Sequence, residues 1–260
     1  MRRRKMSINS DVKKYWEKTP CGTDQTITGD IKPLTKEWFE AVEEYRYEVE
    51  PFIHAIAQFI RYRGKRVLEV GVGAGTDHLQ WARAGTDLYG VDLTAAGIET
   101  TNKRLQIYGF NSNLQKIDAE QLPFPDEYFD VVYSWGVIHH SNDPDLIMDE
   151  IYRVLRVDGE FIGMLYQRPS LTTLRVWVKF ALFRFSPWRS FGDVLYNHVE
   201  SIGTKAYTIS EVKSLCKKFG NISITPLLTA GDINRLPKWL IAFLPNSIGW
   251  FLAIRAVKKS

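Results

Sequence analysis

The stretch Val67-Leu-Glu-Val-Gly-Val-Gly-Ala-Gly-Thr-Asp77 decides how this chain folds, because an apolar run ends there in three closely spaced glycines. Glycine adopts backbone conformations that other residues avoid, so such a turn lets a ligand lie against bare backbone. A helix that begins directly after the turn points its unpaired N–H groups at the same ligand. The stretch therefore predicts a strand, a ligand-binding loop and a helix in succession.

The glycine spacing distinguishes two cofactor classes. A dinucleotide-binding loop reads G-x-G-x-x-G, whereas here the residue three places after Gly73 is Thr76 and the pattern is acidic-x-G-x-G-x-G. The acidic residue is Glu69, whose carboxylate would repel a pyrophosphate and attract the amino group of a methionine moiety. The loop therefore favours a methionine-derived methyl donor over a nicotinamide dinucleotide.

Apolar runs of strand length alternate with helix-like patterns along the rest of the chain. The runs lack a clean alternation of polar and apolar residues, which is typical of strands buried on both faces of a mainly parallel sheet. Strand, helix and strand in repetition predict an α/β fold with a doubly wound, Rossmann-like sheet. The seven predicted strands are Arg66–Val70, Leu88–Asp92, Leu114–Asp118, Val131–Trp135, Phe161–Leu165, Ile222–Leu228 and Trp250–Ala256.

The ends of the predicted helices carry capping residues, proline or glycine. We expect a helix to begin at Pro51 and to bury Ile53, Ile56 and Ile60 on one face. Further helices are expected from Thr94 to Gly109, from Asp143-Pro144 to Gly159, and from a Thr208-x-x-Glu211 capping box to about Gly220.

Two predicted strands end in acidic residues. Asp92 ends the second strand, where its carboxylate can accept hydrogen bonds from two ribose hydroxyls. Asp118 ends the third strand, where its carboxylate can accept a hydrogen bond from an adenine amino group while the backbone of Ala119 contacts the ring edge. Each acid alone is equally well explained as a turn, cap or solvated residue. The presence of both acids at strand exits, downstream of a glycine-rich loop, favours a ligand-binding site over these explanations.

With Asp118-Ala-Glu-Gln-Leu-Pro-Phe-Pro125 and Val137-Ile-His-His140 added, the sequence resembles the class I S-adenosylmethionine-dependent methyltransferases. Within them it is similar to the small-molecule group of the ubiquinone/menaquinone-biosynthesis methyltransferases, which carry a methyltransferase type 11 domain. The resemblance covers about residues 51–165. One departure is Arg156-Val-Asp-Gly159, where Lys/Arg-Pro-Gly-Gly is usual before the fifth strand.

The resemblance implies S-adenosylmethionine as cofactor, a seven-stranded sheet with an antiparallel last strand, and specific contacts. Glu69, Gly71, Gly73 and Gly75 would line the methionine end of the cofactor. The remaining implied contacts are Asp92 and Leu93 at the ribose, Asp118 and Ala119 at the adenine, and Trp135 near the sulfonium.

Methyl transfer from a sulfonium is an in-line displacement that often needs a base to deprotonate the acceptor. The catalytic candidates are His139 and His140 after the fourth strand, and Tyr166 after the fifth. The alternative for the histidines is a hydrogen bond to the start of the next helix. An acceptor that is already an acidic phenol or enol would need no protein base.

Length and composition predict a single domain in a reducing compartment, and the resemblance implies that it is a methyltransferase domain. The chain has 260 residues and two cysteines without metal-ligand spacing, so we expect no metal site. It shows neither a secretory signal nor a membrane-spanning stretch, which predicts a cytoplasmic protein. The expected division is a helical N-terminal cap over 1–49, a cofactor-binding core over 50–166, a lid insertion over 167–207, and a closing helix and strands over 208–260.

Two segments suggest where the acceptor binds. Residues 171–189 and 236–245 are rich in apolar and aromatic side chains with interspersed basic residues. Residues 160–260 contain 14 Lys/Arg against 5 Asp/Glu, whereas residues 1–159 contain 20 against 25. The segments could therefore be ordinary lid helices, or they could touch a membrane surface and admit a lipid-like acceptor.

The leading functional hypothesis is methylation of a small, apolar or lipid-like molecule. An RNA or protein methyltransferase is the second reading, but the turn after the fourth strand, Tyr133-Ser-Trp-Gly136, lacks the Asn/Asp-Pro-Pro-aromatic pattern of amino-methylating enzymes. We therefore expect no nucleic-acid partner. A non-catalytic module that only binds the cofactor is the third reading.

Overall fold

The computed structural model describes residues 2–18, 20–234 and 236–259. Its centre is a seven-stranded sheet in the order β3-β2-β1-β4-β5-β7-β6. Strand β7 is antiparallel to both of its neighbours, and the other pairs are parallel, as expected. The strands are β1 Arg66–Val70, β2 Asp87–Asp92, β3 Asn113–Lys116, β4 Phe129–Trp135, β5 Leu155–Tyr166, β6 Gly220–Leu227 and β7 Phe251–Val257.

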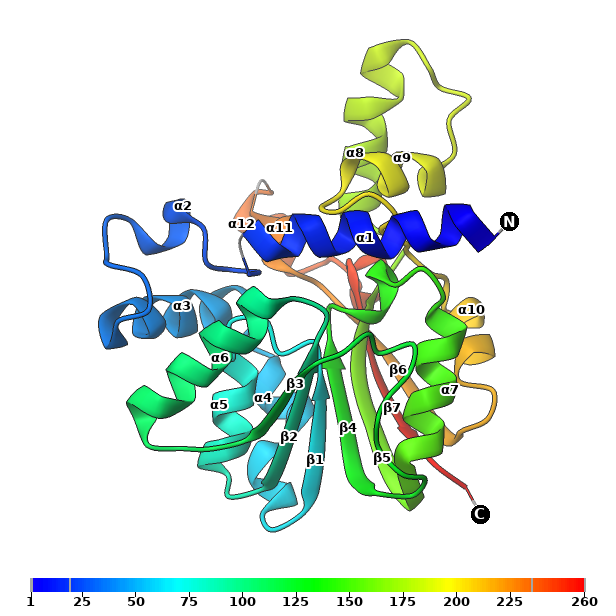
Figure 1. The fold of residues 1–260 in the computed structure, drawn as a ribbon. Coiled ribbons are helices and arrows are strands. Elements are labelled where there is room, and N and C mark those ends of the chain that lie inside the picture. Colours follow the sequence, from blue (N-terminus) through cyan, green and yellow to red (C-terminus); the bar gives the residue numbers. More distant parts are fainter. Residues whose placement is uncertain (1, 19, 235, 260) are drawn as a thin grey trace.

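Both faces of the sheet are buried, which explains the missing polar alternation. Val67 and Tyr133 lie in one hydrophobic cluster, whereas the adjacent Leu68 and Val132 lie in another. The first cluster includes residues of the helices α4 Ile53–Ala57, α5 Thr76–Arg83 and α6 Ala95–Tyr108. The second includes residues of α7 Pro144–Val154 and α10 Ile209–Leu215, which lie on the other side of the sheet in Figure 1.

Three helices precede α4 at the N-terminal end of the described chain. They are α1 Arg2–Lys18, α2 Gln25–Thr28 and α3 Lys36–Val49. Figure 1 shows α1 lying across the carboxyl ends of the strands. In α3, Trp38, Phe39 and Val42 form a small cluster with Ala74 of the glycine loop, so the N-terminal helices pack directly on the loop.

Two insertions leave the sheet at the same end. The first lies between β5 and α10 and forms α8 Leu171–Phe180, the 3-10 turn η3 Leu182–Arg184 and α9 Phe191–His198, which project away from the body (Figure 1). The second lies between β6 and β7 and forms α11 Ala230–Ile233, α12 Lys238–Ile241 and η4 Asn246–Ile248. Within the described residues, no helix has the length and apolarity needed to cross a membrane.

Several of the predicted helix ends are confirmed. Thr94 accepts a hydrogen bond from the Gly97 N–H at the start of α6, and Gly109 ends that helix in the left-handed conformation with φ 74°. Thr208 and Glu211 form the predicted capping box of α10.

The helix predicted from Pro51 is wrong in its extent. Residues 51–52 form a turn, α4 spans only five residues, and Gln58 adopts a left-handed φ of 52° that ends it. The 3-10 turn η1 Phe59–Tyr62 follows, and Ile60 is 80% exposed instead of buried.

Other predicted boundaries were displaced by strand pairing. Helix α7 ends at Val154 because β5 pairs with β4 from Leu155 onward, so Gly159 lies in a strand and not at a helix end. Helix α10 ends at Leu215, well before Gly220, which begins β6. Strand β3 ends at Lys116, so Asp118 follows the strand and does not close it.

Candidate active site

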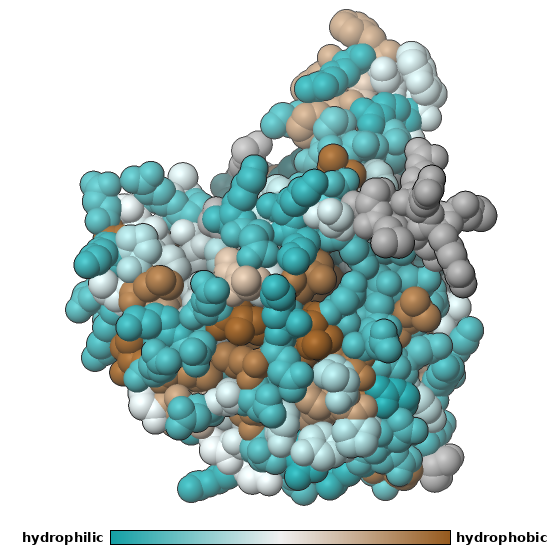
Figure 2. Space-filling model, viewed as in Figure 1, coloured by the Kyte–Doolittle hydropathy of each residue, from teal (hydrophilic) through white to brown (hydrophobic). Residues whose placement is uncertain are grey.

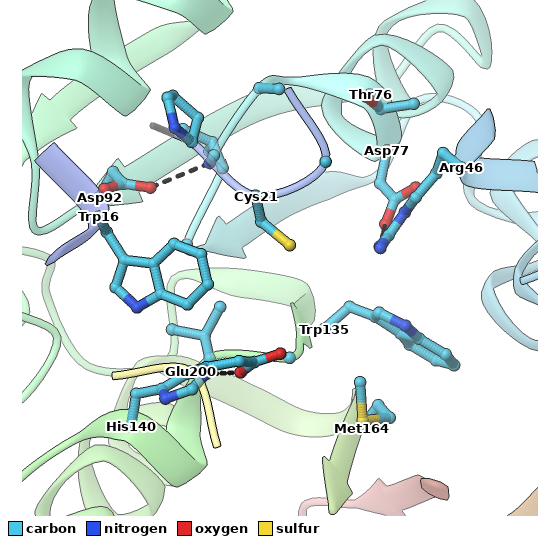
Figure 3. Close-up of a pocket in the computed structure, with 18 of the residues that line it drawn as sticks. Trp16, Cys21, Arg46, Thr76, Asp77, Asp92, Trp135, His140, Met164 and Glu200 are labelled. Atoms are coloured by element: carbon cyan, nitrogen blue, oxygen red, sulfur yellow. Dashed lines mark hydrogen bonds and ion pairs between the residues drawn. The ribbon is translucent and has the colours of Figure 1, made fainter. Parts of the chain in front are cut away.

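A cavity of about 670 Å³ opens beyond the carboxyl ends of the strands. Its wall includes the exits of β1 and β4, which are the neighbouring strands at which the chain order reverses. Ligands of doubly wound sheets bind at this switch point. Figure 3 shows the cavity with Trp16 and Asp92 on one side, Arg46 and Asp77 on the opposite side, and Trp135 in the wall between them.

The three glycines of the loop have different roles. All have positive φ angles, of 83° at Gly71, 52° at Gly73 and 72° at Gly75. A Cβ on Gly71 would lie 2.2 Å from Val137, whereas a Cβ on Gly73 would meet only open space. Gly75 is absent from the described cavity wall, because it packs against Thr101 of α6, whose Cα would lie 3.0 Å from a Cβ placed on Gly75. The loop therefore offers Gly71 and Gly73 to a ligand, and Gly75 serves helix packing.

Asp92 lies in the wall at the end of β2, next to Leu93. Its Oδ2 accepts a hydrogen bond from the Gly73 N–H at 2.9 Å, and its Oδ1 accepts from the backbone N–H and the hydroxyl of Thr94 at 2.8 and 2.6 Å. A carboxylate offers about four acceptor positions. About one position therefore remains for a ligand hydroxyl, and the same carboxylate also fixes the glycine loop.

Asp118 and Ala119 also line the cavity. The side-chain amide of Asn9, from α1, donates to Asp118 Oδ2 at 3.1 Å and to Glu120 at 3.0 Å. The first helix therefore covers the end of the cavity at which the sequence predicts adenine binding.

Glu69 faces the cavity but has a buried partner, His78, whose Nδ1 lies 2.9 Å from Glu69 Oε2. The Nε2 of His78 contacts the Ser112 hydroxyl, and that hydroxyl donates to the Leu88 carbonyl at 2.8 Å. Because Ser112 has one proton, His78 must donate through Nε2 and accept at Nδ1. Glu69 is then the donor, which places a proton on its carboxyl group.

The electrostatics of this pair agree with that assignment. Burial raises the pKa of Glu69 well above its ordinary value and lowers the pKa of His78 to about 3. Both side chains are therefore neutral, so the carboxylate that the sequence places beside the methionine end carries a proton in this structure.

A group of hydrogen-bonded residues surrounds Arg46 of α3. The guanidinium of Arg46 pairs with Asp77 at 2.8 Å and with Glu50 at 2.9 Å. Tyr133 also donates to Asp77 at 2.8 Å, and the Trp135 indole donates to Glu50 at 2.6 Å. Burial opposes ionisation of Asp77, but Arg46 outweighs it, so the pKa of Asp77 is lowered. Trp135, predicted near the sulfonium, is thereby fixed in the wall.

The three catalytic candidates lie close together, but they differ in access. His140 and Tyr166 line the cavity, whereas His139 is fully buried behind it and absent from the described wall. The ring of His139 packs 3.8 Å from that of Tyr166, and burial holds the pKa of His139 well below its ordinary value. Burial likewise raises the pKa of Tyr166 well above its ordinary value, so Tyr166 remains a phenol.

Glu200 completes this cluster and was not predicted. Its Oε1 accepts from the Tyr166 hydroxyl at 2.8 Å, and its Oε2 lies 3.0 Å from His140 Nε2. Ligand atoms of His139, His140 and Glu200 also lie within 4.8 Å of one another, a spacing that a metal ion can use. Glu200 follows α9, and its only signal in the sequence is the scarcity of acids after residue 159.

Desolvation in the cavity wall raises the pKa of the Cys21 thiol to about 12. Cys21 is thus a neutral thiol that is directed into the cavity (Figure 3).

Residues 171–189 and 236–245, which the sequence suggests as the acceptor-binding segments, lie mostly outside the described cavity wall. Of these segments, Thr172 alone lies in the described cavity wall, which otherwise takes Thr229, Ala230, Gly231 and Asn234 from the second insertion. The reason is that α8 and α9 pack mainly on each other, as their contact between Trp177 and Phe191 illustrates, and direct their tip away from the body.

Comparison of the sequence with known protein families finds one match. Residues 68–163 match the methyltransferase domain family, and they contain the glycine loop, Asp92, Asp118 and Trp135. Over these residues the core of this chain resembles a class I S-adenosylmethionine-dependent methyltransferase domain. The match ends before the projecting lid helices and begins after the N-terminal helices.

Curated relatives resemble this methyltransferase domain over part of their length. The chain is 37% identical over 106 residues to the uncharacterised methyltransferase YcgJ of Bacillus subtilis, covering 40% of this chain and 42% of that protein. It is 35% identical over 125 residues to a fatty-acid O-methyltransferase of Mycolicibacterium smegmatis, covering 47% and 44%. It is 27% identical over 143 residues to the ubiquinone/menaquinone biosynthesis C-methyltransferase of Vibrio parahaemolyticus, covering 53% and 54%. The aligned part is thus about half of these relatives.

Solved structures share the fold over more of the chain. The structure of geranyl diphosphate C-methyltransferase from Streptomyces coelicolor A3(2), with Mg²⁺, geranyl diphosphate and S-adenosyl-L-homocysteine, matches with a TM-score of 0.60 at 14% identity. The match covers 96% of this chain and 98% of that one. The structure of YcgJ matches with a TM-score of 0.53 at 19% identity, covering 80% and 99%.

Proposed function

We propose that this protein transfers a methyl group from S-adenosylmethionine to a small, apolar or lipid-like molecule. The observation that carries the proposal is the gathering of Gly71, Gly73, Asp92, Asp118 and Trp135 around one cavity at the switch point of a methyltransferase domain. Bound there, the cofactor would supply a sulfonium-activated methyl group.

The chemistry of the wall fits this cofactor. Asp92 retains an acceptor position for a ribose hydroxyl, and Gly73 leaves open space above the backbone. Asp118 and Ala119 lie together at the end that suits adenine, and Trp135 provides an aromatic face that attracts a sulfonium cation. The volume of about 670 Å³ lies within the range of pockets that hold drug-sized ligands.

The acceptor would occupy the opposite end of the cavity. Met164, Tyr166, Trp250 and Phe251 form an apolar wall there, in which the Tyr166 ring stacks on those of Trp250 and Phe251. Such a wall suits a ring or an aliphatic chain better than a polar polymer. Relatives named for fatty acid, quinone and phthiotriol acceptors support the same class of molecule.

Calorimetry with S-adenosylmethionine, S-adenosylhomocysteine and NAD tests the cofactor assignment. We expect both sulfur compounds to bind with micromolar dissociation constants and NAD to bind much more weakly. Transfer of label from methyl-labelled S-adenosylmethionine into a cell extract tests the acceptor class. Label in the organic phase supports the proposal, label in RNA or protein favours the second reading, and binding without transfer favours the non-catalytic module.

A specific observation favours contact with a membrane surface. The lid tip, defined as residues 182–188, exposes Phe183 by 73%, Phe185 by 88% and Trp188 by 79%, with Arg184 among them. Aromatic and basic side chains together suit the headgroup boundary of an anionic bilayer. Figure 2 shows this projection as a mixture of hydrophobic and hydrophilic surface, and Trp239 and Phe243 of the second insertion are 69% and 78% exposed.

Liposome flotation tests this contact. We expect the protein to float with vesicles that contain phosphatidylglycerol and to be released by salt, because exposed charges are screened. Combined replacement of Phe183, Phe185 and Trp188 by serine should abolish flotation. The control is Ile60→Ser, which removes an equally exposed apolar side chain outside the lid. Equal flotation of both variants would contradict membrane contact through the lid tip.

A further inference from the structure

The lid insertion places one carboxylate in the cavity wall. Glu200 follows α9, and its side chain is 32% exposed where it faces the cavity. Its backbone has a φ of 52°, a left-handed conformation that is uncommon and costly for a residue other than glycine. Figure 3 shows the carboxylate beside His140, near Trp135 and Met164. The fold thus holds an acid in a strained position at the acceptor end of the cavity.

The hydrogen bonds around Glu200 determine where protons can be. The hydroxyl of Thr204 donates to the Ser201 carbonyl at 2.8 Å, so toward His140 Nδ1, at 3.1 Å, it can only accept. The hydroxyl of Ser201 lies 3.0 Å from the same nitrogen and can donate to it. The Nε2 atom of His140 lies 3.0 Å from Glu200 Oε2 but has no hydrogen-bond partner within the described chain. The Tyr166 phenol donates to the other carboxylate oxygen and cannot itself serve as the base.

We propose that Glu200 is the catalytic base of the transfer and that the acceptor is an uncharged molecule with a hydroxyl group on an apolar body. This inference rests on the proposed methyltransferase function. The acceptor hydroxyl gives its proton to Glu200 while its oxygen forms a bond to the methyl carbon. The carbon–sulfur bond breaks, and its electron pair stays on sulfur as neutral S-adenosylhomocysteine. The positive charge of the sulfonium and the negative charge of the Glu200 carboxylate are both lost in the step.

The charges of the wall restrict the acceptor. Arg46 is the only Lys or Arg among the cavity-lining residues of the described chain, and both of its terminal nitrogens are paired, with Asp77 and Glu50. The wall also includes Asp92, Asp118 and Glu200. A carboxylate or phosphate at the acceptor end would find no free cation and would face negative charge. A neutral hydroxyl donates to Glu200 without this cost.

The matched variants are Glu200→Gln and Glu99→Gln. Glutamine keeps an oxygen that accepts from Tyr166 but cannot take a proton, whereas Glu99 is an exposed acid of α6 outside the cavity. We expect Glu200→Gln to lower kcat for methylation of 4-nonylphenol 100- to 10,000-fold with KM little changed, the range of general-base catalysis. Glu99→Gln should leave kcat unchanged. Both variants should bind S-adenosylhomocysteine within about threefold of wild type in calorimetry.

The pH profile separates a base from a structural residue. Wild-type kcat should fall toward acid pH, and Glu200→Gln should show no such fall. The groups that face Glu200 are His140, Tyr166, Tyr15, Cys21 and Glu50.

A binding experiment decides the inference even without turnover. 4-Nonylphenol and 4-nonylbenzoate share ring and tail and differ only in the hydroxyl or carboxylate. The wild-type complex with S-adenosylhomocysteine should bind the phenol at least tenfold more tightly, and Glu200→Gln should narrow this difference. Equal binding of both probes by wild type would overturn the inference.

Three further outcomes would also overturn it. Activity of Glu200→Gln within threefold of wild type would exclude a base role. Parallel loss of S-adenosylhomocysteine binding would make Glu200 a structural residue. One metal ion per chain by elemental analysis, lost in Glu200→Gln, would mean that the histidines and Glu200 hold a cation instead of a proton. By contrast, failure of wild type to bind S-adenosylhomocysteine would refute the proposed function itself.

Discussion

At the scale of single residues, proton positions in the cavity wall follow from hydrogen bonds that the sequence does not reveal. The chain from Leu88 through Ser112 and His78 to Glu69 leaves Glu69 as the proton donor. The positively charged ammonium group of the methionine moiety stabilises the ionised form of a neighbouring carboxyl group. Cofactor binding should therefore lower the raised pKa of Glu69.

We therefore predict that binding of S-adenosylmethionine near neutral pH releases a proton. The measurement is calorimetry in buffers with different ionisation enthalpies, in which the observed enthalpy should change with the buffer. Glu69→Gln should abolish this dependence. A buffer-independent enthalpy for the wild type would mean that Glu69 keeps its proton in the complex.

A second prediction at this scale concerns Asp92. With about one acceptor position left for the ribose, Asp92→Ala should weaken cofactor binding by about 1.5–3 kcal/mol, or roughly 10- to 150-fold, the usual range for a hydrogen bond to a charged group. Loss of the Gly73 hydrogen bond adds to the effect. Calorimetry measures it against Asp87→Ala, an exposed acid at the other end of β2. Equal affinities of the two variants would contradict a ribose role for Asp92.

At the scale of elements, α1 closes the cavity through a few polar contacts. Glu17 Oε1 accepts from the first two backbone N–H groups of α6, those of Ala95 and Ala96, at 3.0 and 3.2 Å. Trp16 packs on His140, and Asn9 covers Asp118. A carboxylate at a helix N-terminus is stabilised by the helix dipole, so Glu17 anchors the C-terminal half of α1 over the cavity.

We predict that Glu17→Ala accelerates dissociation of S-adenosylhomocysteine about three- to tenfold, because each lost hydrogen bond stabilises the closed arrangement by about 0.5–1.5 kcal/mol. Stopped-flow tryptophan fluorescence is the measurement, since Trp16 and Trp135 line the cavity. Glu99→Gln on α6 serves as the control. An unchanged dissociation rate would show that α1 does not retain the cofactor.

At the scale of the whole molecule, buried histidines tie stability to pH. Neither ring nitrogen of His139 has a hydrogen-bond partner within the described chain, and burial keeps its pKa well below 6.5. Below pH 6.5 the unfolded chain binds a proton at this residue that the folded protein does not bind. The free energy of unfolding therefore falls with decreasing pH, by about 1.4 kcal/mol per unit for this histidine.

The test is His139→Phe, which keeps a ring against Tyr166 and cannot titrate. We expect the variant to have nearly the stability of wild type at pH 8 and to be progressively more stable below pH 6.5, as measured by urea denaturation. Parallel stability curves for the two proteins across pH 5–8 would contradict a buried, neutral His139.

The sequence by itself determined the sheet and the cofactor end. Strands β1, β2, β4 and β7 could be located because central strands are continuous apolar runs, and the seven-stranded order with an antiparallel β7 followed the resemblance. The placement of Gly71, Gly73, Asp92 and Trp135 in one wall was predictable, since strand exits of a doubly wound sheet converge. These features depend on local spacing and on chain order.

Only the tertiary structure decided the remaining features. Arg46 and Glu200 reach the cavity from segments far from the glycine loop in sequence, and no spacing rule connects them to it. The exclusion of Gly75 and His139 from the wall results from packing against Thr101 and Tyr166. The proton on Glu69 depends on a hydrogen-bond chain through three elements. Long-range contacts of this kind are set by how the elements pack, which a linear pattern does not encode.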